Sequence, residues 1–332
     1  MTEEKQWQKT NKSITLYDLS LTQLPKTIFI LGPTASGKTV WGLDLAKRFN
    51  GVIISADSRQ VYKKMDIGTA KPKGKWQGKG EKRAYYVNNL PHYLMDFLDP
   101  GEIFTAAEFR DSALNIIQTT EQNRLIPFVV GGTGLYISAL ADNWLIPRVP
   151  PNKKLRQSLE EKTHDELIHL LSLLDPRGVS VVDEKNKRRL IRALEVSILS
   201  GIPFSKQRVK GERVLDPLMI GIHTPREKLY ERIDERIETM IEEGLLNEAK
   251  QLLKQKYGWQ LPSMNSIGYK QLKKYLAGQM SLEQAIGKLK TDTRHFAKHQ
   301  LTWFRRYDDI HWCKTIREAE TLISNFLSSK KR

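Results

Sequence analysis

The sequence has little cysteine and no long apolar run, and each shortage excludes a class of protein. Cys313 is its single cysteine, which excludes an intramolecular disulfide and any cysteine-rich zinc module. No segment approaches the ~20 consecutive apolar residues that a membrane-spanning helix needs. The polar start, "MTEEKQWQKTNKS", lacks the apolar region of a signal peptide. We therefore expect a cytoplasmic protein that has no membrane partner.

Acidic residues are also scarce relative to basic ones. The chain of 332 residues has 54 lysines and arginines against 38 aspartates and glutamates, for a net charge of +16. Such an excess favours a polyanionic partner, nucleic acid before membrane. A lysine-rich proteome would give the same total, so the positions of the charges must decide between the two interpretations.

Strand and helix patterns alternate along the first half of the chain. The apolar segments "TIFILG", "GVIISA" and "RLIPFVVGG" are typical of buried strands, and helical patterns separate them. This alternation predicts an α/β fold with a parallel sheet. Proline-rich "VPPN" begins a helical insertion, after which "PLMIGIHTP" returns as a strand. Nearly everything that follows is predicted to be helical, in the segments 227–257, 265–277, 281–306 and 314–328.

These patterns predict a domain organisation. We expect a loose N-terminal extension over 1–24, an α/β core made of 25–150 and 206–332, and a helical insertion domain over 151–205. Within the core, "KPKGKWQGKGEKRAYY", 71–86, is predicted to be a basic glycine-rich loop.

The segment "GPTASGKT" is a phosphate-binding loop of the kind that ATP- and GTP-binding proteins use. It matches G-x(4)-G-K-[ST], follows a strand and opens a helix, as the motif requires. Its backbone N–H groups and the helix N-terminus form an anion nest, and the Lys38 ammonium adds a positive charge. The Thr39 hydroxyl is suited to bind Mg²⁺. The loop comprises Gly32, Pro33, Thr34, Ala35, Ser36, Gly37, Lys38 and Thr39.

The acid that a nucleotide hydrolase keeps at a strand end is missing from "PFVVGGTG", where glycine stands instead. Asp57 does follow a strand, and parallel strands end at the same edge of a sheet. We expect Asp57 near the phosphate loop, where it could accept a proton from an acceptor group. A metal-supporting aspartate displaced to this strand is the alternative. Thr133 offers a hydroxyl at the same edge, and Arg226, after a later strand, is a further candidate for the phosphate site.

Two basic stripes follow. Lys185, Arg188, Arg189 and Arg192 have the i, i+3, i+4, i+7 spacing of one helical face. In "TRHFAKHQLTWFRR", Arg294, Lys298 and Arg305 lie roughly along another. A solvated surface would explain either stripe alone. Two stripes in a chain of this charge favour a phosphate-backbone partner.

Several motifs together resemble one family. "GPTASGKT", "ISADSRQVYKKMDIGTAKP", "PHYLMDFLDP", "VVGGTGLY", "RALEV", "SIGYKQL" and "TRHFAKHQLTWFRR" occur in the order found in tRNA dimethylallyltransferases, the IPP transferase family. The resemblance covers about residues 25–310. It implies a P-loop NTPase-like core with a tRNA-contacting helical insertion. It also implies Mg²⁺-dependent transfer of a dimethylallyl group from dimethylallyl diphosphate to N6 of the adenine 3′-adjacent to the anticodon.

The resemblance implies a role for each matched residue. Asp57 would be the general base, Lys38 and Thr133 would assist catalysis, and the phosphate loop would bind the diphosphate of the donor. The tRNA anticodon arm would be the partner. Its implied contacts are Asp57, Ser58, Arg59, Gln60, Arg156, Arg188, Arg189, Leu190, Ile191, Arg192, Asn265, Gly268, Tyr269, Lys270, Lys298, His299, Gln300, Trp303 and Arg305.

Three other functions remain open on the sequence. An adenylate isopentenyltransferase shares the loop but modifies free AMP, ADP or ATP, and has no need for two basic stripes. A small-molecule P-loop kinase would require the missing strand-end acid. A non-catalytic RNA-binding protein would leave the phosphate loop unexplained. No heptad pattern indicates an oligomer interface, so we expect a monomer.

Overall fold

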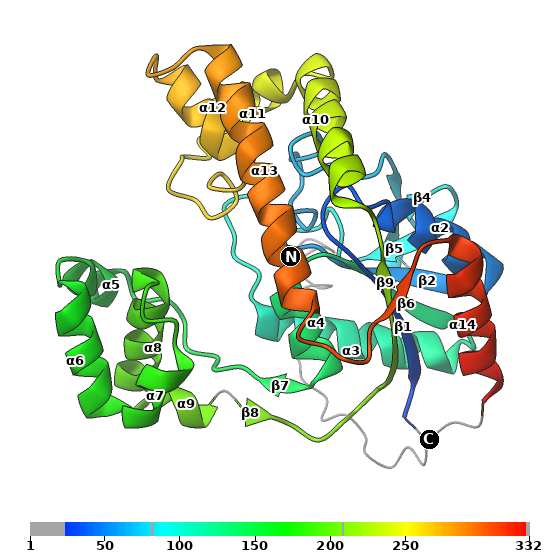
Figure 1. Ribbon diagram of the computed structural model, residues 1–332, viewed down its shortest axis with the longest axis horizontal. Coiled ribbons are helices and arrows are strands. Elements are labelled where there is room, and N and C mark those ends of the chain that lie inside the picture. Colours follow the sequence, from blue (N-terminus) through cyan, green and yellow to red (C-terminus); the bar gives the residue numbers. More distant parts are fainter. Residues whose placement is uncertain (1–23, 81–82, 208, 330–332) are drawn as a thin grey trace. The chain divides into compact units, whose positions relative to one another are not determined.

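The computed structural model describes residues 24–80, 83–207 and 209–329, which form two compact units (Figure 1). The first unit consists of the chain up to 137 together with 214 onward, and the second consists of 138–213. Apart from residue 24, the predicted N-terminal extension lies outside the described residues. None of the helices described combines the length and apolar composition that a bilayer crossing needs.

An eight-stranded sheet forms the first unit, in the order β10-β9-β1-β6-β2-β5-β4-β3. Parallel pairing runs from β10 to β5, and β4 and β3 add an antiparallel edge. The predicted α/β fold with a parallel sheet is confirmed. The strands are β1 Lys26–Leu31, β2 Gly51–Ala56, β3 Lys75–Gln77, β4 Ala84–Val87, β5 Leu90–Tyr93, β6 Ile126–Gly131, β9 Asp216–Ile222 and β10 His311–Cys313.

The prediction of a loop over 71–86 is wrong for part of that segment. It contains β3 and the start of β4, and Trp76 of β3 lies opposite Tyr85 of β4. Trp76 also donates from Nε1 to a carboxylate oxygen of Asp96 at 3.0 Å. The strand pairing gives this glycine-rich segment an order that its composition does not indicate.

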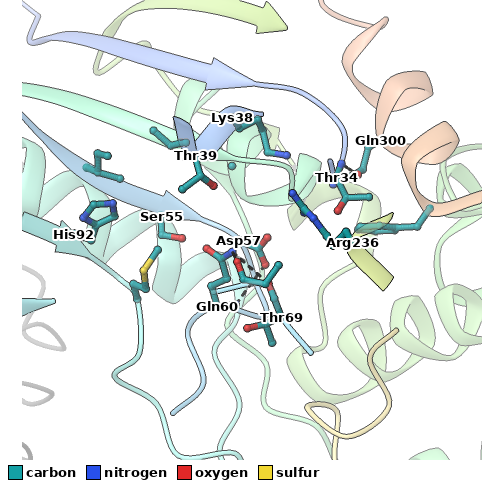
Figure 2. A pocket seen from close by; sticks show the side chains of 16 residues that line it. Thr34, Lys38, Thr39, Ser55, Asp57, Gln60, Thr69, His92, Arg236 and Gln300 are labelled. Atoms are coloured by element: carbon teal, nitrogen blue, oxygen red, sulfur yellow. Dashed lines mark hydrogen bonds between the residues drawn. The ribbon is translucent and has the colours of Figure 1, made fainter. Parts of the chain in front are cut away.

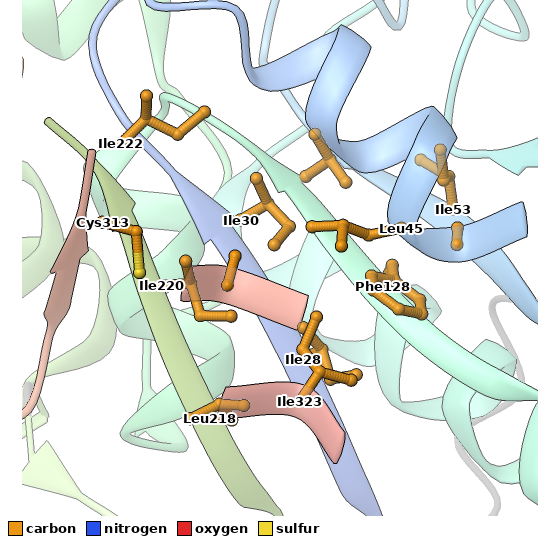
Figure 3. Close-up of a cluster of buried hydrophobic side chains, with 13 residues drawn as sticks. Ile28, Ile30, Leu45, Ile53, Phe128, Leu218, Ile220, Ile222, Cys313 and Ile323 are labelled. Atoms are coloured by element: carbon orange, nitrogen blue, oxygen red, sulfur yellow. The ribbon is translucent and has the colours of Figure 1, made fainter. Parts of the chain in front are cut away.

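The central strands are buried on both faces, which explains their continuous apolar runs. On one face, Ile28, Ile30, Phe128 and Ile220 pack with Leu45 in a single apolar cluster (Figure 3). Two helices cover this face, α2 (Lys38–Arg48) and α14 (Ile316–Ser328). Alternate side chains face the other side of the sheet, where α3 (Ala106–Gln122) contacts β6 and β2.

The C-terminal helices of the first unit stand at the end of the sheet where the strands finish (Figure 1). The predicted helix 227–257 is broken at Gly244, whose φ of 101° places it in the left-handed region. The longest helix, α13, contacts both α10 and α12. The helices are α10 Arg226–Glu242, α11 Leu245–Lys254, α12 Tyr269–Leu276 and α13 Leu282–Phe304.

The second unit is mainly helical, and a short ribbon of β7 (Trp144–Leu145) and β8 (Val209–Lys210) belongs to it. Its bounds are therefore wider than the predicted insertion. Its apolar core includes Leu159, Leu167 and Leu190, which lie on three different helices. The helices are α5 Lys153–Glu160, α6 His164–Leu174, α7 Pro176–Val181, α8 Lys187–Ser200 and α9 Phe204–Gln207.

Candidate active site

The phosphate loop joins β1 to α2, as its motif predicts. Ala35 and Gly37 have φ values of 63° and 94°, so the chain alternates into the left-handed region that turns successive N–H groups inward. The Ser36 hydroxyl is buried and has no hydrogen-bond partner among the described residues. A buried hydroxyl of this kind needs a partner, and its place in the phosphate loop suits it to donate to a phosphate oxygen.

Lys38 carries the charge of this loop. Its Nζ donates to the Pro33 carbonyl at 2.6 Å. Burial lowers the pKa of Lys38 to about 8, the nearby Asp57 carboxylate acts in the opposite direction, and Arg236 lowers it further. A bound anion would restore the ammonium form, because an opposite charge raises the pKa of a lysine.

Asp57 follows β2 directly and lies in the same pocket as Lys38 (Figure 2). Its Oδ1 accepts the N–H of Arg59 at 2.9 Å and, more weakly, that of Gln60 at 3.4 Å. This turn fixes the carboxyl group in place and leaves Oδ2 for a ligand in the pocket. The predicted proximity of Asp57 to the phosphate loop is therefore confirmed.

Thr133 ties the turn after β2 to the turn after β6. Its Oγ1 accepts the N–H of Ser58 at 3.0 Å and donates to the Ser58 hydroxyl at 3.3 Å. The hydroxyl that was expected to contact substrate is thus already engaged in positioning the segment that begins at Asp57. Gln60 is similarly occupied, since its Nε2 donates to the carbonyls of Thr69 and Ala70.

Two overlapping pockets meet at Asp57. The inner one, of about 100 Å³, includes Lys38, Thr39 and Asp57. The outer one, of about 470 Å³, also includes Asp57 and extends along α10 and α13. Its lining combines hydrogen-bonding groups with an apolar wall, which consists of Ile233, Ile237, Met240, Leu289 and Phe296.

Arg236 is the site residue that the sequence interpretation missed. It lines both pockets, and burial lowers its pKa, although Asp57 acts in the opposite direction. Arg226, the arginine considered instead, donates to the Tyr230 hydroxyl and lines neither pocket. The helical spacing of Ile233, Arg236 and Ile237 would have placed this arginine on the inward face of α10.

The described residues offer no group of three His, Cys, Asp or Glu side chains that could hold a metal ion alone. A single carboxylate, that of Asp57, lines the inner pocket, together with several hydroxyls that include the one of Thr39. This sparse donor set fits Mg²⁺, which usually takes one or two protein ligands together with substrate phosphates and water.

The segment after Asn265 is partly buried. Tyr269, an implied tRNA contact, is fully buried and donates its hydroxyl to Glu248 at 2.6 Å. The same carboxylate accepts the N–H groups of Asp66, Ile67 and Gly68. The Tyr269 side chain is therefore engaged inside the protein and is not available to tRNA. Asn265 and Gly268 line the outer pocket, and Lys270 is exposed.

In the second unit, several of the implied tRNA contacts have internal partners instead. Leu190 and Ile191, which the resemblance assigns to the tRNA-contacting segment, have side chains in the apolar core, where RNA cannot reach them. Arg156 and Arg192 both pair with Glu195, which is fully buried. Hydrogen bonds from these two arginines lower the pKa of Glu195, against the opposing effect of burial.

The basic stripe of the insertion is accordingly narrower than predicted. Lys185 precedes α8, whose N-cap is Asn186, so it does not continue the helical face. Arg189 pairs with Asp183 at 3.1 Å, and Arg188 is exposed.

The residues at the C-terminal end of α13, and Arg305 directly after it, divide by exposure. Lys298, His299 and Arg305 are exposed, whereas Gln300 is buried. Trp303 is half-buried and lines the outer pocket with His299. Arg294, which was placed on the basic stripe, pairs with Asp234 of α10.

Comparisons with known proteins agree on one family. The family model for IPP transferases matches residues 60–307. A tRNA dimethylallyltransferase of Roseiflexus sp. (strain RS-1) is 42% identical over 287 residues, covering 85% of this chain and 91% of that protein. The tRNA dimethylallyltransferase 1 of Citrifermentans bemidjiense is 39% identical over 305 residues, covering 91% of this chain and 96% of that protein.

Solved structures are similar as well. The full-length tRNA isopentenylpyrophosphate transferase of Bacillus halodurans has a TM-score of 0.66 and 37% identity, and the match covers 91% of this chain and 97% of that one. A eukaryotic dimethylallyltransferase acting on tRNA has a TM-score of 0.71 and 28% identity, with 90% and 77% covered. The phosphate loop, the adjacent carboxylate and these matches over most of the chain lead to one conclusion: the chain belongs to the IPP transferase family.

Proposed function

We propose that this protein is a tRNA dimethylallyltransferase that uses dimethylallyl diphosphate and Mg²⁺. The observation that carries the proposal is the meeting of Lys38, Arg236 and Asp57 in one pocket, with an outer pocket large enough for an acceptor base. The two cations are suited to bind a diphosphate, and the single carboxylate is suited to accept one proton. The relatives named above have the same activity in their names.

The proposed reaction is one substitution at an allylic carbon. The adenine N6 lone pair forms the new N–C bond, and the C–O bond to the diphosphate breaks with its electron pair leaving on oxygen. Lys38, Arg236 and the loop N–H groups stabilise that developing negative charge. The N6 proton passes to Asp57, whose turn holds the carboxylate in place while Oδ2 accepts it.

Mg²⁺, when bound at the Thr39 hydroxyl and the diphosphate, would supply further charge neutralisation for the leaving group. The protein's own part is to bind the diphosphate in the nest and to hold Thr39 at the start of α2. The apolar wall of the outer pocket would exclude water from the dimethylallyl carbon.

The acceptor is proposed to be the adenine beside the anticodon of a tRNA. To reach Asp57 the base must leave its stack and enter the outer pocket, as in base flipping. Exposed Lys298 and His299 of α13, and Arg305 directly after it, would contact the RNA backbone, and exposed Arg188 of the second unit would add a further contact. A monomeric state and a cytoplasmic location are parts of the same proposal.

A transfer assay tests the function. With labelled dimethylallyl diphosphate and unmodified tRNA, we expect label on N6 of the target adenine, and excess AMP should not compete because it lacks the RNA backbone. Asp57→Asn keeps the turn acceptor but cannot take the proton, so turnover should fall by roughly 10²–10⁴-fold. Its tRNA affinity should stay within about threefold, because the carboxylate is not needed for the phosphate contacts.

Labelled AMP in place of labelled tRNA would instead support an adenylate isopentenyltransferase. Wild-type turnover in Asp57→Asn would remove Asp57 as the base.

The pKa of Lys38 generates a pH dependence. The ammonium form binds the anionic donor, and in the free enzyme it is lost as pH rises through about 8. Donor binding raises this pKa, which means that the donor binds the ammonium form more tightly than the neutral amine. Because kcat/KM reports the ionisation of the free enzyme, kcat/KM for the donor should be constant below pH 8 and fall about tenfold per pH unit above it. Lys38→Arg should move the fall to higher pH, because a guanidinium stays protonated. An unchanged profile in that variant would exclude Lys38 as its origin.

The second unit offers a matched pair of arginines. Arg188→Ala should weaken tRNA binding and reduce the slope of log affinity against log salt by about 1, with no loss of stability. Arg192→Ala should instead destabilise the fold by about 1–3 kcal/mol, because it removes a hydrogen bond from the buried Glu195 carboxylate. Filter binding over a salt series and urea unfolding separate the two effects. Loss of stability in Arg188→Ala alone would reverse this assignment.

A further inference from the structure

Gln300 bridges two backbone segments of the active site. Its Oε1 accepts the N–H of Thr34, in the phosphate loop, at 2.8 Å. Its Nε2 donates to the carbonyl of Gly132, in the turn after β6, at 2.8 Å. Both ends of the side-chain amide are therefore engaged, and the side chain is only 8% exposed.

Two glycines of "VVGGTG" leave room for the approach of α13 to the turn after β6. A Cβ on Gly132 would lie 2.3 Å from Gln300 Nε2, so any other residue would displace the amide. A Cβ on Gly134 would lie 2.4 Å from the ring of Trp303, one helical turn further along α13. The turn after β6 thus lacks side chains where α13 approaches it, and glycine at both positions permits the close approach.

The position of Gln300 on α13 distinguishes it from its neighbours. Lys298 and His299 are exposed and free to contact RNA, whereas Gln300 points from the helix to the phosphate loop (Figure 2). An amide that is buried and held by backbone partners at both ends is fixed in orientation, so it is suited to positioning those two segments.

We propose that Gln300 is a positioning residue for the diphosphate site and not a tRNA contact. It holds the first turn of the phosphate loop against the turn after β6, and so fixes the loop N–H groups at the spacing that the donor diphosphate needs. Donor affinity therefore depends on a residue of α13, the helix whose exposed side contacts the RNA. This inference rests on the proposed function, because it assumes that the loop binds the donor.

Equilibrium binding of labelled dimethylallyl diphosphate, with Mg²⁺ and without tRNA, tests the proposal on the full chain. Gln300→Met keeps the side-chain volume but removes both hydrogen bonds, and should weaken donor binding about tenfold. Its tRNA affinity, measured by filter binding, should remain within about twofold of wild type. Gln300→Glu keeps the acceptor for Thr34 but places a carboxylate against the Gly132 carbonyl, and should also weaken donor binding.

Lys298→Met is the matched control, two residues earlier on the exposed side of α13. It should weaken tRNA binding and leave donor binding unchanged. Gly132→Ala should weaken donor binding by displacing the Gln300 amide, and combining it with Gln300→Met should cause little further loss. Thermal unfolding of each variant identifies any that lose the fold. If Gln300→Met is one of these, the donor affinity of the Gln300→Glu variant is the deciding measurement.

Normal donor binding with weakened tRNA binding in folded Gln300→Met would overturn the assignment and make Gln300 an RNA contact. Independent, additive losses for Gly132→Ala and Gln300→Met would overturn it as well. Failure of the wild-type protein to bind the donor at all would contradict the proposed function itself, and is thus distinguishable from both.

Discussion

The active site depends on two desolvated cations held beside one carboxylate. Lys38 and Arg236 each have a pKa that burial lowers, and Asp57 is the acid that opposes this change in both. A single carboxylate cannot compensate two buried positive charges, so the pocket favours a multiply charged anion. A bound diphosphate would take over the pairing with these two cations, which leaves the Asp57 carboxylate able to accept a proton. The arrangement therefore suits a reaction in which diphosphate is the leaving group better than a site that only binds an anion.

The sheet brings these groups together from distant parts of the chain. β1 leads into the phosphate loop, β2 ends at Asp57, and β6 leads to Thr133, all at one edge because the three strands are parallel. The residues at this edge of the sheet do not form the whole site. Arg236 and Gln300 reach it from α10 and α13, which contact each other, so the C-terminal helices complete the chemistry and also present the exposed basic side chains.

Much of this could be predicted from the sequence. The phosphate loop, the nearby Asp57 and the parallel sheet follow from local patterns with strict geometric consequences. Arg236 was missed because it is one arginine among many on a charged helix, and its inward position follows only when it is read together with the apolar spacing of Ile233 and Ile237. Leu190 and Tyr269 lie within motifs whose neighbouring residues are exposed, and only the burial seen in the structure distinguishes their side chains. Short edge strands such as β3 have too few residues to show the alternation of apolar and polar side chains that predicts a strand.

In the proposed reaction, the diphosphate bound by the phosphate loop is the leaving group, and no nucleotide is hydrolysed to drive the transfer. The most direct measurement is the stoichiometry of phosphate products during transfer from dimethylallyl diphosphate to unmodified tRNA. We expect one intact diphosphate to be released for each N6-dimethylallyladenine formed, with no orthophosphate and no requirement for ATP. Release of orthophosphate in step with transfer, or transfer that depends on ATP hydrolysis, would contradict it.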